Sequence, residues 1–271
     1  MITAQSIGEA LRRYLATHPG NRLDNGARIY DEPLVGAASA DDPYFEEFRK
    51  PGIIGDIFRT PGEWLDGAAS VVSFFLPFSD AIRKSNRPNG IPSVEWLHGR
   101  FKGEVLNNDG KRFVASLIEN EGHRALAPTL DARFVQTLDF RSSWSERHVA
   151  FVAGLGTFGL SRGLITAKGM AGRFGSVVTD LKLPVTPRAY SSPFEYCLAL
   201  SGKVQCQVCI NRCPAGAITA EGKAHPPCSD YLRVTDPLKE VRAALGYAYS
   251  ACGNCQTGVP CEAGIPVAPE T

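Results

Sequence analysis

A helical repeat of apolar side chains marks the start of the chain. Ile7, Leu11, Tyr14 and Leu15 fall on one face of a helix, and Gly20 can end it. The opposite face is polar, and nothing in the first twenty residues resembles the apolar core of a signal peptide. This pattern predicts an ordinary amphipathic helix that packs on a core.

Three further stretches carry a clear pattern. Mostly apolar stretches over 70–76 and 177–183, each followed by proline, predict two strands, the first of them buried. Residues 93–121 have helical spacing, and Gly110 is expected to break or separate two helices there. Helices mixed with buried strands predict a layered α/β or α+β domain.

Composition narrows the class of protein. The chain has 271 residues, of which 44% are hydrophobic, so a core is expected. The net charge is +1 and no dense run of Lys and Arg occurs, so a nucleic-acid partner is not indicated, although it stays open. No run approaches the ~18 apolar residues of a membrane span, and we expect a cytoplasmic protein without a membrane partner.

The proline-rich stretch 184–194 is the expected linker between two domains, 1–190 and 191–271.

All eight cysteines lie after residue 196. Cys206, Cys209 and Cys213 form a Cys-x2-Cys-x3-Cys-Pro run, which is the back half of an iron–sulfur motif whose first cysteine is replaced by Lys203. Eight thiolates match two 4Fe–4S clusters, because each cluster takes four. In a reducing compartment, clustered cysteines indicate metal rather than disulfides.

The proline after Cys213 predicts that this cysteine crosses to the other cluster, as in two-cluster ferredoxins. The predicted ligands of cluster one are Cys197, Cys206, Cys209 and Cys261, and those of cluster two are Cys213, Cys228, Cys252 and Cys255. Two alternatives stay open. The cysteines could form structural zinc sites, or Cys197 could be a core residue that leaves cluster one with three ligands.

A glycine-dense segment follows a predicted helix. Gly154, Gly156 and Gly159 fit G-x-G-x-x-G, but the preceding residues are helical rather than a strand, which disfavours a dinucleotide site. The glycines serve either as turns or as places where the backbone approaches a large flat ligand.

The segment ERHVAFVAGLGTFGLSRGLIT, followed by RFGSVVTDLKLP, resembles the core of epoxyqueuosine reductases. CQVCINRCPAGAIT, CSDYL and CGNC agree with the ferredoxin portion of that family, and reductive dehalogenases share the arrangement. The resemblance covers roughly residues 68–261. It implies a nitroreductase-like α+β core that binds cobalamin, and a C-terminal ferredoxin-like module with two 4Fe–4S clusters that feeds it electrons.

By this resemblance, a corrin would be lined by Gly154, Leu155, Gly156, Thr157, Gly159, Gly175 and Ser176. Candidate proton donors are Asp139, Glu146 and His148, since a carboxylic acid or imidazole suits that role. The family's catalytic Asp is shifted by one position here, and the final Cys-Pro is replaced by Cys261-Glu262. The chain also ends without the helical-repeat domain common in that family, which makes tRNA a less expected substrate.

The sequence therefore predicts an iron–sulfur oxidoreductase that passes electrons through two clusters to a corrinoid. Its substrate is expected to be a small molecule or modified nucleoside, and its electrons are expected from an external ferredoxin or flavodoxin. Two competing interpretations stay open. One is an electron-transfer or corrinoid-reducing protein without its own substrate, and the other is a flavin enzyme on the same core.

Overall fold

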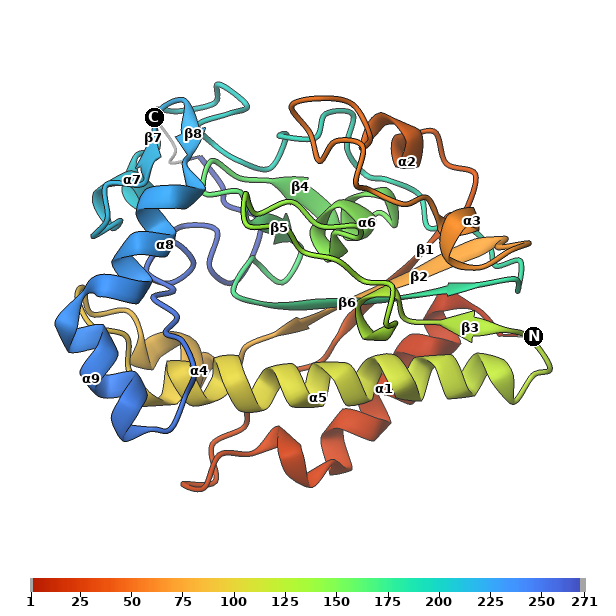
Figure 1. Cartoon of the computed structure of the whole chain (residues 1–271), viewed down its shortest axis with the longest axis horizontal. Coiled ribbons are helices and arrows are strands. Elements are labelled where there is room, and N and C mark those ends of the chain that lie inside the picture. Colours follow the sequence, from red (N-terminus) through yellow and green to blue (C-terminus); the bar gives the residue numbers. More distant parts are fainter. Residues whose placement is uncertain (1, 269–271) are drawn as a thin grey trace.

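The structure is a computed structural model that describes residues 2–268, and its centre is a four-stranded antiparallel sheet (Figure 1). The strands lie in the order β1 (Leu34–Ser39), β2 (Ser70–Pro77), β6 (Gly172–Thr179) and β3 (Ala125–Leu126). Side chains of β2 alternate between the two faces, and all eight residues of the strand are buried. Helices and loops cover both faces, which explains why β2 carries apolar side chains at positions that face both ways.

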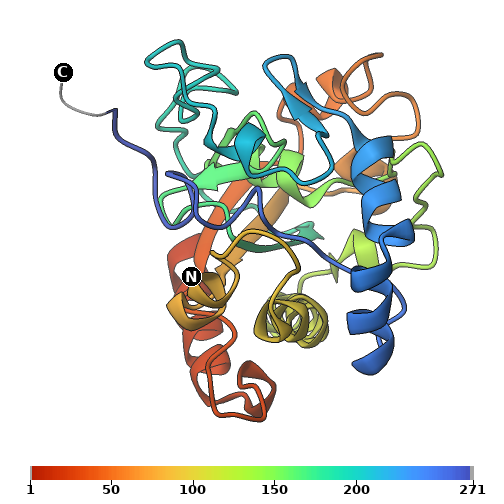
Figure 2. The same ribbon diagram turned by 90° about the vertical axis from the view of Figure 1, so that its left-hand side faces the viewer.

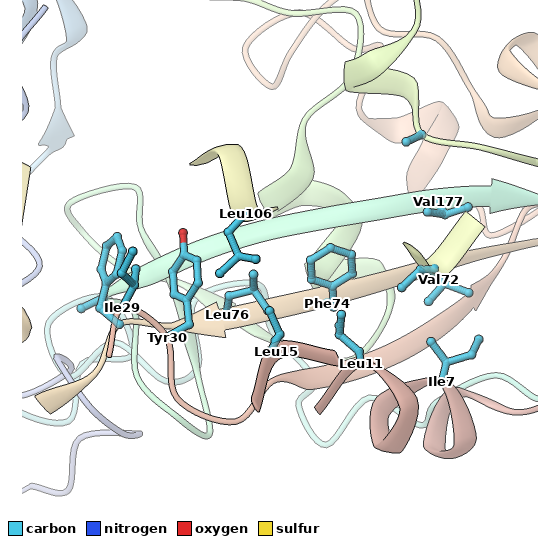
Figure 3. Packing of buried hydrophobic residues seen from close by; sticks show 14 of the residues in the cluster. Ile7, Leu11, Leu15, Ile29, Tyr30, Val72, Phe74, Leu76, Leu106 and Val177 are labelled. Atoms are coloured by element: carbon cyan, nitrogen blue, oxygen red, sulfur yellow. The ribbon is translucent and has the colours of Figure 1, made fainter. Parts of the chain in front are cut away.

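One face of the sheet is covered by α1 (Ala4–Thr17) and α5 (Val94–Glu119). Figure 3 shows Leu11 of α1 pointing toward Phe74 of β2, with Leu106 of α5 packed beside the same strand. The predicted break at Gly110 is wrong, because α5 is continuous through it. A helical glycine costs about 1 kcal/mol, and here a Cβ at Gly110 would lie 3.6 Å from Phe74, so the glycine brings helix and sheet close together.

The other face carries shorter elements, α2 (Tyr44–Glu47), α3 (Pro61–Trp64) and α6 (Glu146–Val152). The hairpin β4 (Gly156–Phe158) and β5 (Leu164–Thr166) follows α6. An aromatic cluster fills the layer, with Trp144 stacked on Phe45 and Phe58 at ring-centroid distances of 6.3 and 5.7 Å. The short helix α4 (Asp80–Ser85) and the 3-10 turn Pro19–Asn21 contact α5 on the first face, and the turn Pro128–Leu130 contacts β6.

The C-terminal part lies at one end of the molecule (Figures 1 and 2). It contains α7 (Val208–Asn211), β7 (Ile218–Thr219), β8 (Gly222–Lys223), α8 (His225–Val234) and α9 (Asp236–Ala244). A separate hydrophobic cluster joins Leu160, Ile165 and Met170 to Cys197 and Val259. Residues on both sides of the predicted linker therefore share one core.

Several sequence predictions can be compared with the structure. The first helix and the strand over 70–76 are confirmed, and the order of α6 and β4 differs from a dinucleotide fold, as expected. The second strand was misplaced, because β6 covers 172–179 and the chain leaves the sheet where Asp180 pairs with Arg124 at 2.8 Å. Within residues 2–268, no helix is long and apolar enough to cross a membrane.

The proline-rich stretch 184–194 has no regular structure, and it lies along the free edge of β1. Thr186 donates its N–H to Ala37 O at 2.8 Å and accepts the Ala37 N–H on its hydroxyl at 3.0 Å. This pairing satisfies polar groups of an exposed sheet edge.

Candidate functional site

An open cavity of about 520 Å³ lies between α5, α6 and the start of β6, and we call it the polar cavity. Its walls include Glu104, Asn108, Lys111, Thr129, Phe134, Gln136, Ser142, Trp144, Ser145, Glu146, Arg147, Gly163, Leu164, Met170, Gly172, Arg173, Phe174 and Gln256. The volume lies within the roughly 300–1,000 Å³ of small-molecule sites. A corrinoid is a larger ligand than such sites hold, so part of it would extend through the open mouth.

Glu146 is the centre of a buried polar network in this cavity. Its carboxylate accepts hydrogen bonds from the hydroxyls of Thr129 (3.0 Å) and Ser176. Lys111 Nζ lies 3.5 Å from Oε1, and the Lys111 side chain is only 3% exposed. Trp144 Nε1 donates to Ser176 Oγ at 2.9 Å and so fixes that hydroxyl. Burial raises the pKa of Glu146, while Lys111 and the two hydroxyls lower it.

The three predicted proton donors are not brought together. Glu146 lines the polar cavity, whereas Asp139 and His148 do not. Asp139 is exposed, and hydrogen bonds from Thr137 and Arg141 lower its pKa, so it is ionised near neutral pH. Burial, with Arg147 nearby, lowers the pKa of His148 to about 3, so its imidazole is neutral.

The predicted corrin-lining segment has a different environment from the one expected. None of its seven residues lines the polar cavity, and only Ser176 reaches it, through Glu146. A Cβ at Gly156 would lie 2.0 Å from Ile165 O, and one at Gly175 would lie 2.3 Å from the Phe74 ring. These glycines allow protein segments to pack closely, which leaves no open space for a ligand beside them.

The eight cysteines line two further cavities, four in each. The first cysteine cavity contains Cys197, Cys206, Cys209 and Cys261, and the second contains Cys213, Cys228, Cys252 and Cys255. Lys203, in the slot of the missing motif cysteine, is exposed, while Cys197 is buried against the first cavity. The grouping in space is the one that the spacing predicts.

The two cysteine cavities differ in size. The second has a volume of about 260 Å³, but the first has only about 20 Å³. Met170 Sδ lies 3.2 Å from Cys261 Sγ in the first cavity.

Electrostatic coupling is found mainly within each group of thiols, although Cys209 and Cys255 also couple across the two groups. Burial, together with the neighbouring thiols of Cys209, Cys197 and Cys206, raises the pKa of Cys261 to about 12. The pKa of Cys252 is also about 12, through burial and then its neighbours Cys255, Cys228 and Cys213. In residues 2–268, no three Cys, His, Asp or Glu side chains converge on a point where one metal ion could be held. The thiols instead stand around the walls of each cavity.

The second cysteine cavity and the polar cavity are neighbours. Gly172, Arg173 and Gln256 line both of them. Arg173 Nη2 is buried and has no hydrogen-bond partner in the described part of the chain, which marks a place where a ligand acceptor would be stabilised.

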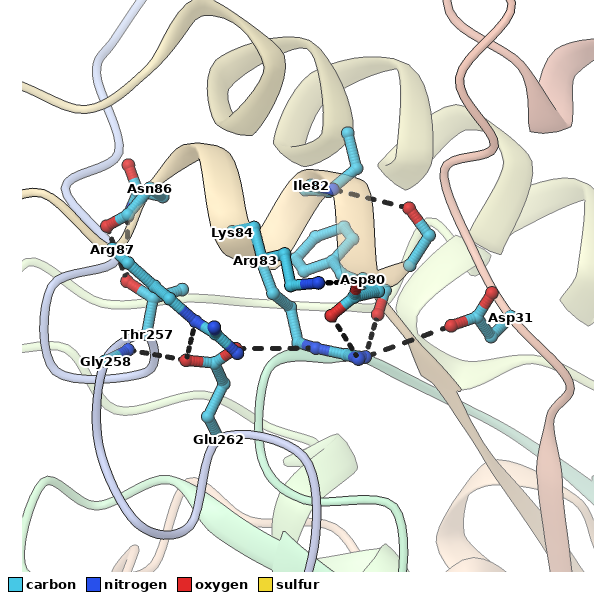
Figure 4. A network of polar contacts seen from close by, with 12 residues as sticks. Asp31, Asp80, Ile82, Arg83, Lys84, Asn86, Arg87, Thr257, Gly258 and Glu262 are labelled. Carbon is cyan, nitrogen blue, oxygen red and sulfur yellow. Dashed lines mark hydrogen bonds and ion pairs between the residues drawn. The ribbon is translucent and has the colours of Figure 1, made fainter.

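The loop that carries the last cysteines is anchored by Glu262 (Figure 4). Its carboxylate, 5% exposed, accepts from Arg87 Nη2 at 2.9 Å and Arg87 Nε at 3.2 Å, and from the Gly258 N–H. Arg83 Nε lies 3.6 Å away. Asn86 donates to Cys252 O at 3.1 Å, so α4 and the residues after it hold both ends of the loop.

Several residues of the site were not predicted from the sequence, notably Lys111, Thr129, Trp144 and Arg173. Lys111 had a detectable signal, because it lies on the same helical face as Val114 and is buried there. Arg173 had none, because its role depends on how β6 meets distant cysteine loops.

Comparisons with known proteins show which proteins the chain resembles. No known family profile matches the chain. An epoxyqueuosine reductase of Vibrio cholerae is 28% identical over 211 residues, which are 74% of this chain and 52% of the relative. The chain resembles epoxyqueuosine reductases. It spans about half the length of this curated relative.

Solved structures give the same likeness. A Bacillus subtilis epoxyqueuosine reductase, whose catalytic aspartate loop is swung out of the active site, has a TM-score of 0.56 at 17% identity. The match covers 98% of this chain and 68% of the other. A reductive dehalogenase, whose structure suggests a mechanism for B12-dependent dehalogenation, has a TM-score of 0.51 at 14% identity, covering 75% and 27%. The mixed α/β fold and the resemblance to both groups are thereby confirmed.

Proposed function

We propose that this protein is an iron–sulfur oxidoreductase that delivers electrons through two 4Fe–4S clusters to a corrinoid at the polar cavity. The observation that carries the proposal is the shared wall of Gly172, Arg173 and Gln256 between the second cysteine cavity and the polar cavity. An electron donor site and a ligand site that share a wall are the arrangement that an internal electron-transfer route requires.

The donor sets fit the clusters. Cys197, Cys206, Cys209 and Cys261 would hold one cluster, and Cys213, Cys228, Cys252 and Cys255 the other. The pKa of Cys209, raised to about 12 by burial and by neighbouring thiols that include Cys255, links the two sets electrostatically. A bound cation reverses this effect and favours the thiolate.

The polar cavity fits a ligand with polar edges. Arg173 Nη2 lacks a partner there, and Lys111, Glu146 and Gln256 present polar groups toward the same space. A bound corrinoid would supply the reducing centre, as cofactors do for chemistry that side chains cannot perform. In place of the glycine segment, we assign the cavity walls, with Trp144 and Phe174, to hold it.

Glu146 is the side chain that best fits the proton-donor role. It lines the cavity, and burial raises the pKa of its carboxyl, which favours the protonated form. Ser176 and Thr129 fix both carboxyl oxygens, so the proton would be held at a defined position. Asp139 is on an exposed loop and would have to move inward to take part.

The substrate and the electron donor are proposals of the same kind. A small molecule or modified nucleoside would enter the polar cavity, and an external one-electron donor would supply electrons to the clusters. One solved neighbour is an epoxyqueuosine reductase with an epoxyqueuosine-modified tRNA stem loop, so tRNA is a substrate to be tested alongside small molecules.

Anaerobic reconstitution with iron, sulfide and hydroxocobalamin tests the proposal. We expect about eight iron atoms per chain, an absorption band typical of the clusters, and retention of cobalt after desalting. A chain that holds iron but no cobalt would support the electron-transfer interpretation instead. A chain that holds neither would refute the proposal.

A further inference from the structure

Two buried hydrogen-bond donors that line the second cysteine cavity have no partner within residues 2–268. They are the indole Nε1 of Trp96 and the hydroxyl of Ser250, and each residue is only 2% exposed. Buried polar side-chain atoms normally have a hydrogen-bond partner, so an unpaired one needs an explanation. An indole N–H can only donate, and it therefore requires an acceptor.

Trp96 lies against the turn that carries two of the predicted ligands. It stands near the start of α5, at the end of the molecule that holds the C-terminal part (Figure 1). A Cβ at Gly253, between Cys252 and Cys255, would lie 2.4 Å from Trp96 Nε1, and Gly253 has a φ of 74°. Only glycine allows the turn to approach the indole so closely. The indole nitrogen is thus held beside the turn between two ligands of the same set.

The segment that carries Ser250 is fixed to the same helix. Tyr247 stacks on Phe101 of α5 with a ring-centroid distance of 4.0 Å, and its hydroxyl lies 2.6 Å from His98 Nδ1. Ser250 follows Tyr247 closely in the chain and comes directly before the stretch that enters Cys252. Both donors are therefore positioned by the first turns of α5 and do not depend on the cysteine loops alone.

The first cysteine cavity has a different lining. In the described part of the chain, none of the residues that line it has a buried side-chain nitrogen or oxygen without a partner. Two further residues of the second cavity have atoms that are unpaired among the described residues, but they differ in kind from Trp96 and Ser250. Arg173 stands on the wall shared with the polar cavity, and Asn254 Oδ1 is an acceptor.

We infer that Trp96 Nε1 and Ser250 Oγ donate hydrogen bonds to sulfur atoms of the second cluster, and so raise its reduction potential above that of the first cluster. One electron from the external donor makes a cluster more negative, and hydrogen bonds to its sulfide or thiolate sulfurs stabilise that reduced state. The electron then passes from the first cluster to the second, whose cavity shares a wall with the polar cavity. This inference deepens the proposed function and rests on it.

Redox titration of the reconstituted chain, followed by electron paramagnetic resonance, tests the inference. The wild type should show two one-electron steps. Cys197→Ser identifies the step that belongs to the second cluster, because this variant leaves the second set of ligands complete. We expect the second cluster to be reduced at the higher potential. A second cluster that is reduced at the lower potential would overturn the inference.

Trp96→Phe and Ser250→Ala each remove one donor and keep all eight cysteines. At a fixed potential, each should lower the ratio of reduced to oxidised second cluster about tenfold, which is a shift of about 59 mV to lower potential. The step of the first cluster should not move. Trp64→Phe is the matched control, because the Trp64 indole N–H is also buried and unpaired in the described chain but lines neither cysteine cavity. Wild-type potentials in both Trp96→Phe and Ser250→Ala would overturn the inference.

Pulsed electron paramagnetic resonance of protein labelled with ¹⁵N at the tryptophan indoles detects the contact of Trp96 directly. The reduced second cluster should couple to one indole nitrogen. This coupling should disappear in Trp96→Phe and persist in Trp64→Phe, which a change in packing alone would not produce. A wild-type protein without the coupling would overturn the role of Trp96.

Iron and cobalt contents of the same samples separate this inference from the proposed function. About eight iron atoms per chain with unshifted potentials would refute only the hydrogen bonds. A wild-type chain without iron would refute the proposed function and this inference together. If one variant loses iron, the other variant and the nitrogen coupling of the wild type still decide the question.

Discussion

Replacing Glu262 by Gln should destabilise the protein measurably, because the carboxylate is the centre of a nearly buried ionic network. The side chain is 5% exposed, and Arg83 beside it is 12% exposed. Glutamine keeps the size of Glu262 but removes the charge, and its amide N–H₂ has no acceptor among the arginine donors. Breaking a buried ion pair costs about 3–5 kcal/mol. Arg87 is 45% exposed, so solvent screens its interaction with Glu262. We therefore expect Glu262→Gln to lower the free energy of unfolding by about 2–3 kcal/mol in total.

For a chain of this size, about 2–4 °C of unfolding temperature corresponds to 1 kcal/mol. Glu262→Gln should therefore lower Tm by about 4–12 °C, measured by circular dichroism of the metal-free chain at a fixed scan rate. Glu240→Gln, an exposed position on α9, is the control and should shift Tm little. A Glu262→Gln variant whose Tm equals that of the control would show that the network does not stabilise the C-terminal loop.

Three other changes test separate parts of the structure. Gly156→Ala should destabilise the metal-free chain by more than about 2 kcal/mol in urea unfolding, because its Cβ would lie 2.0 Å from Ile165 O. Gly62→Ala is the control and should be nearly neutral, because a Cβ at Gly62 would meet open space. Equal stability of the two would contradict the packing role. Because burial raises the pKa of Glu146, the native state holds an extra proton above the carboxyl's ordinary pKa of 4.5, so the contribution of Glu146 to the free energy of unfolding falls as pH rises through this range. Glu146→Gln should lack that contribution, so the difference in free energy of unfolding between the wild type and Glu146→Gln should change with pH. A difference that does not change with pH would refute the raised pKa of Glu146. Cys197→Ser should retain one complete 4Fe–4S cluster and an incomplete second one, and two complete clusters by iron count and spectroscopy would show that another residue fills the gap.

The spacing of apolar residues predicted correctly those helices and strands that are buried in the same way along their whole length. The run over 70–76 is apolar on both faces because β2 is covered on both faces. The start of β6 was missed because Gly172 and Gly175 have low strand propensity. In the structure they are required, since a Cβ at either would meet a side chain of β2.

The polar cavity could not be assembled from the sequence, because its residues come from segments far apart. Lys111, Glu146 and Ser176 lie far apart in the sequence, and no motif spacing relates them. Only the contact of α5, α6 and β6 makes them one network. The assignment of the glycine segment to a corrin stays a prediction, since the same spacing serves either a ligand or close packing of β4 on β5.

The cysteines were more predictable, because their count and the proline after Cys213 limit how two sets of four can form. The structure places the two sets around separate cavities and adds what the spacing could not supply, which is the support of the crossing loop. Cys252 and Cys261 belong to different sets, so the loop between them must keep its shape for both sets to be complete. Glu262 occupies the position where the resembling family has proline, and its carboxylate binds Gly258 within that loop and Arg87 outside it. A proline restricts the loop through its own backbone, whereas this chain restricts it through an ion pair to the residues after α4. The departure at Glu262 is therefore an alternative means of positioning Cys261.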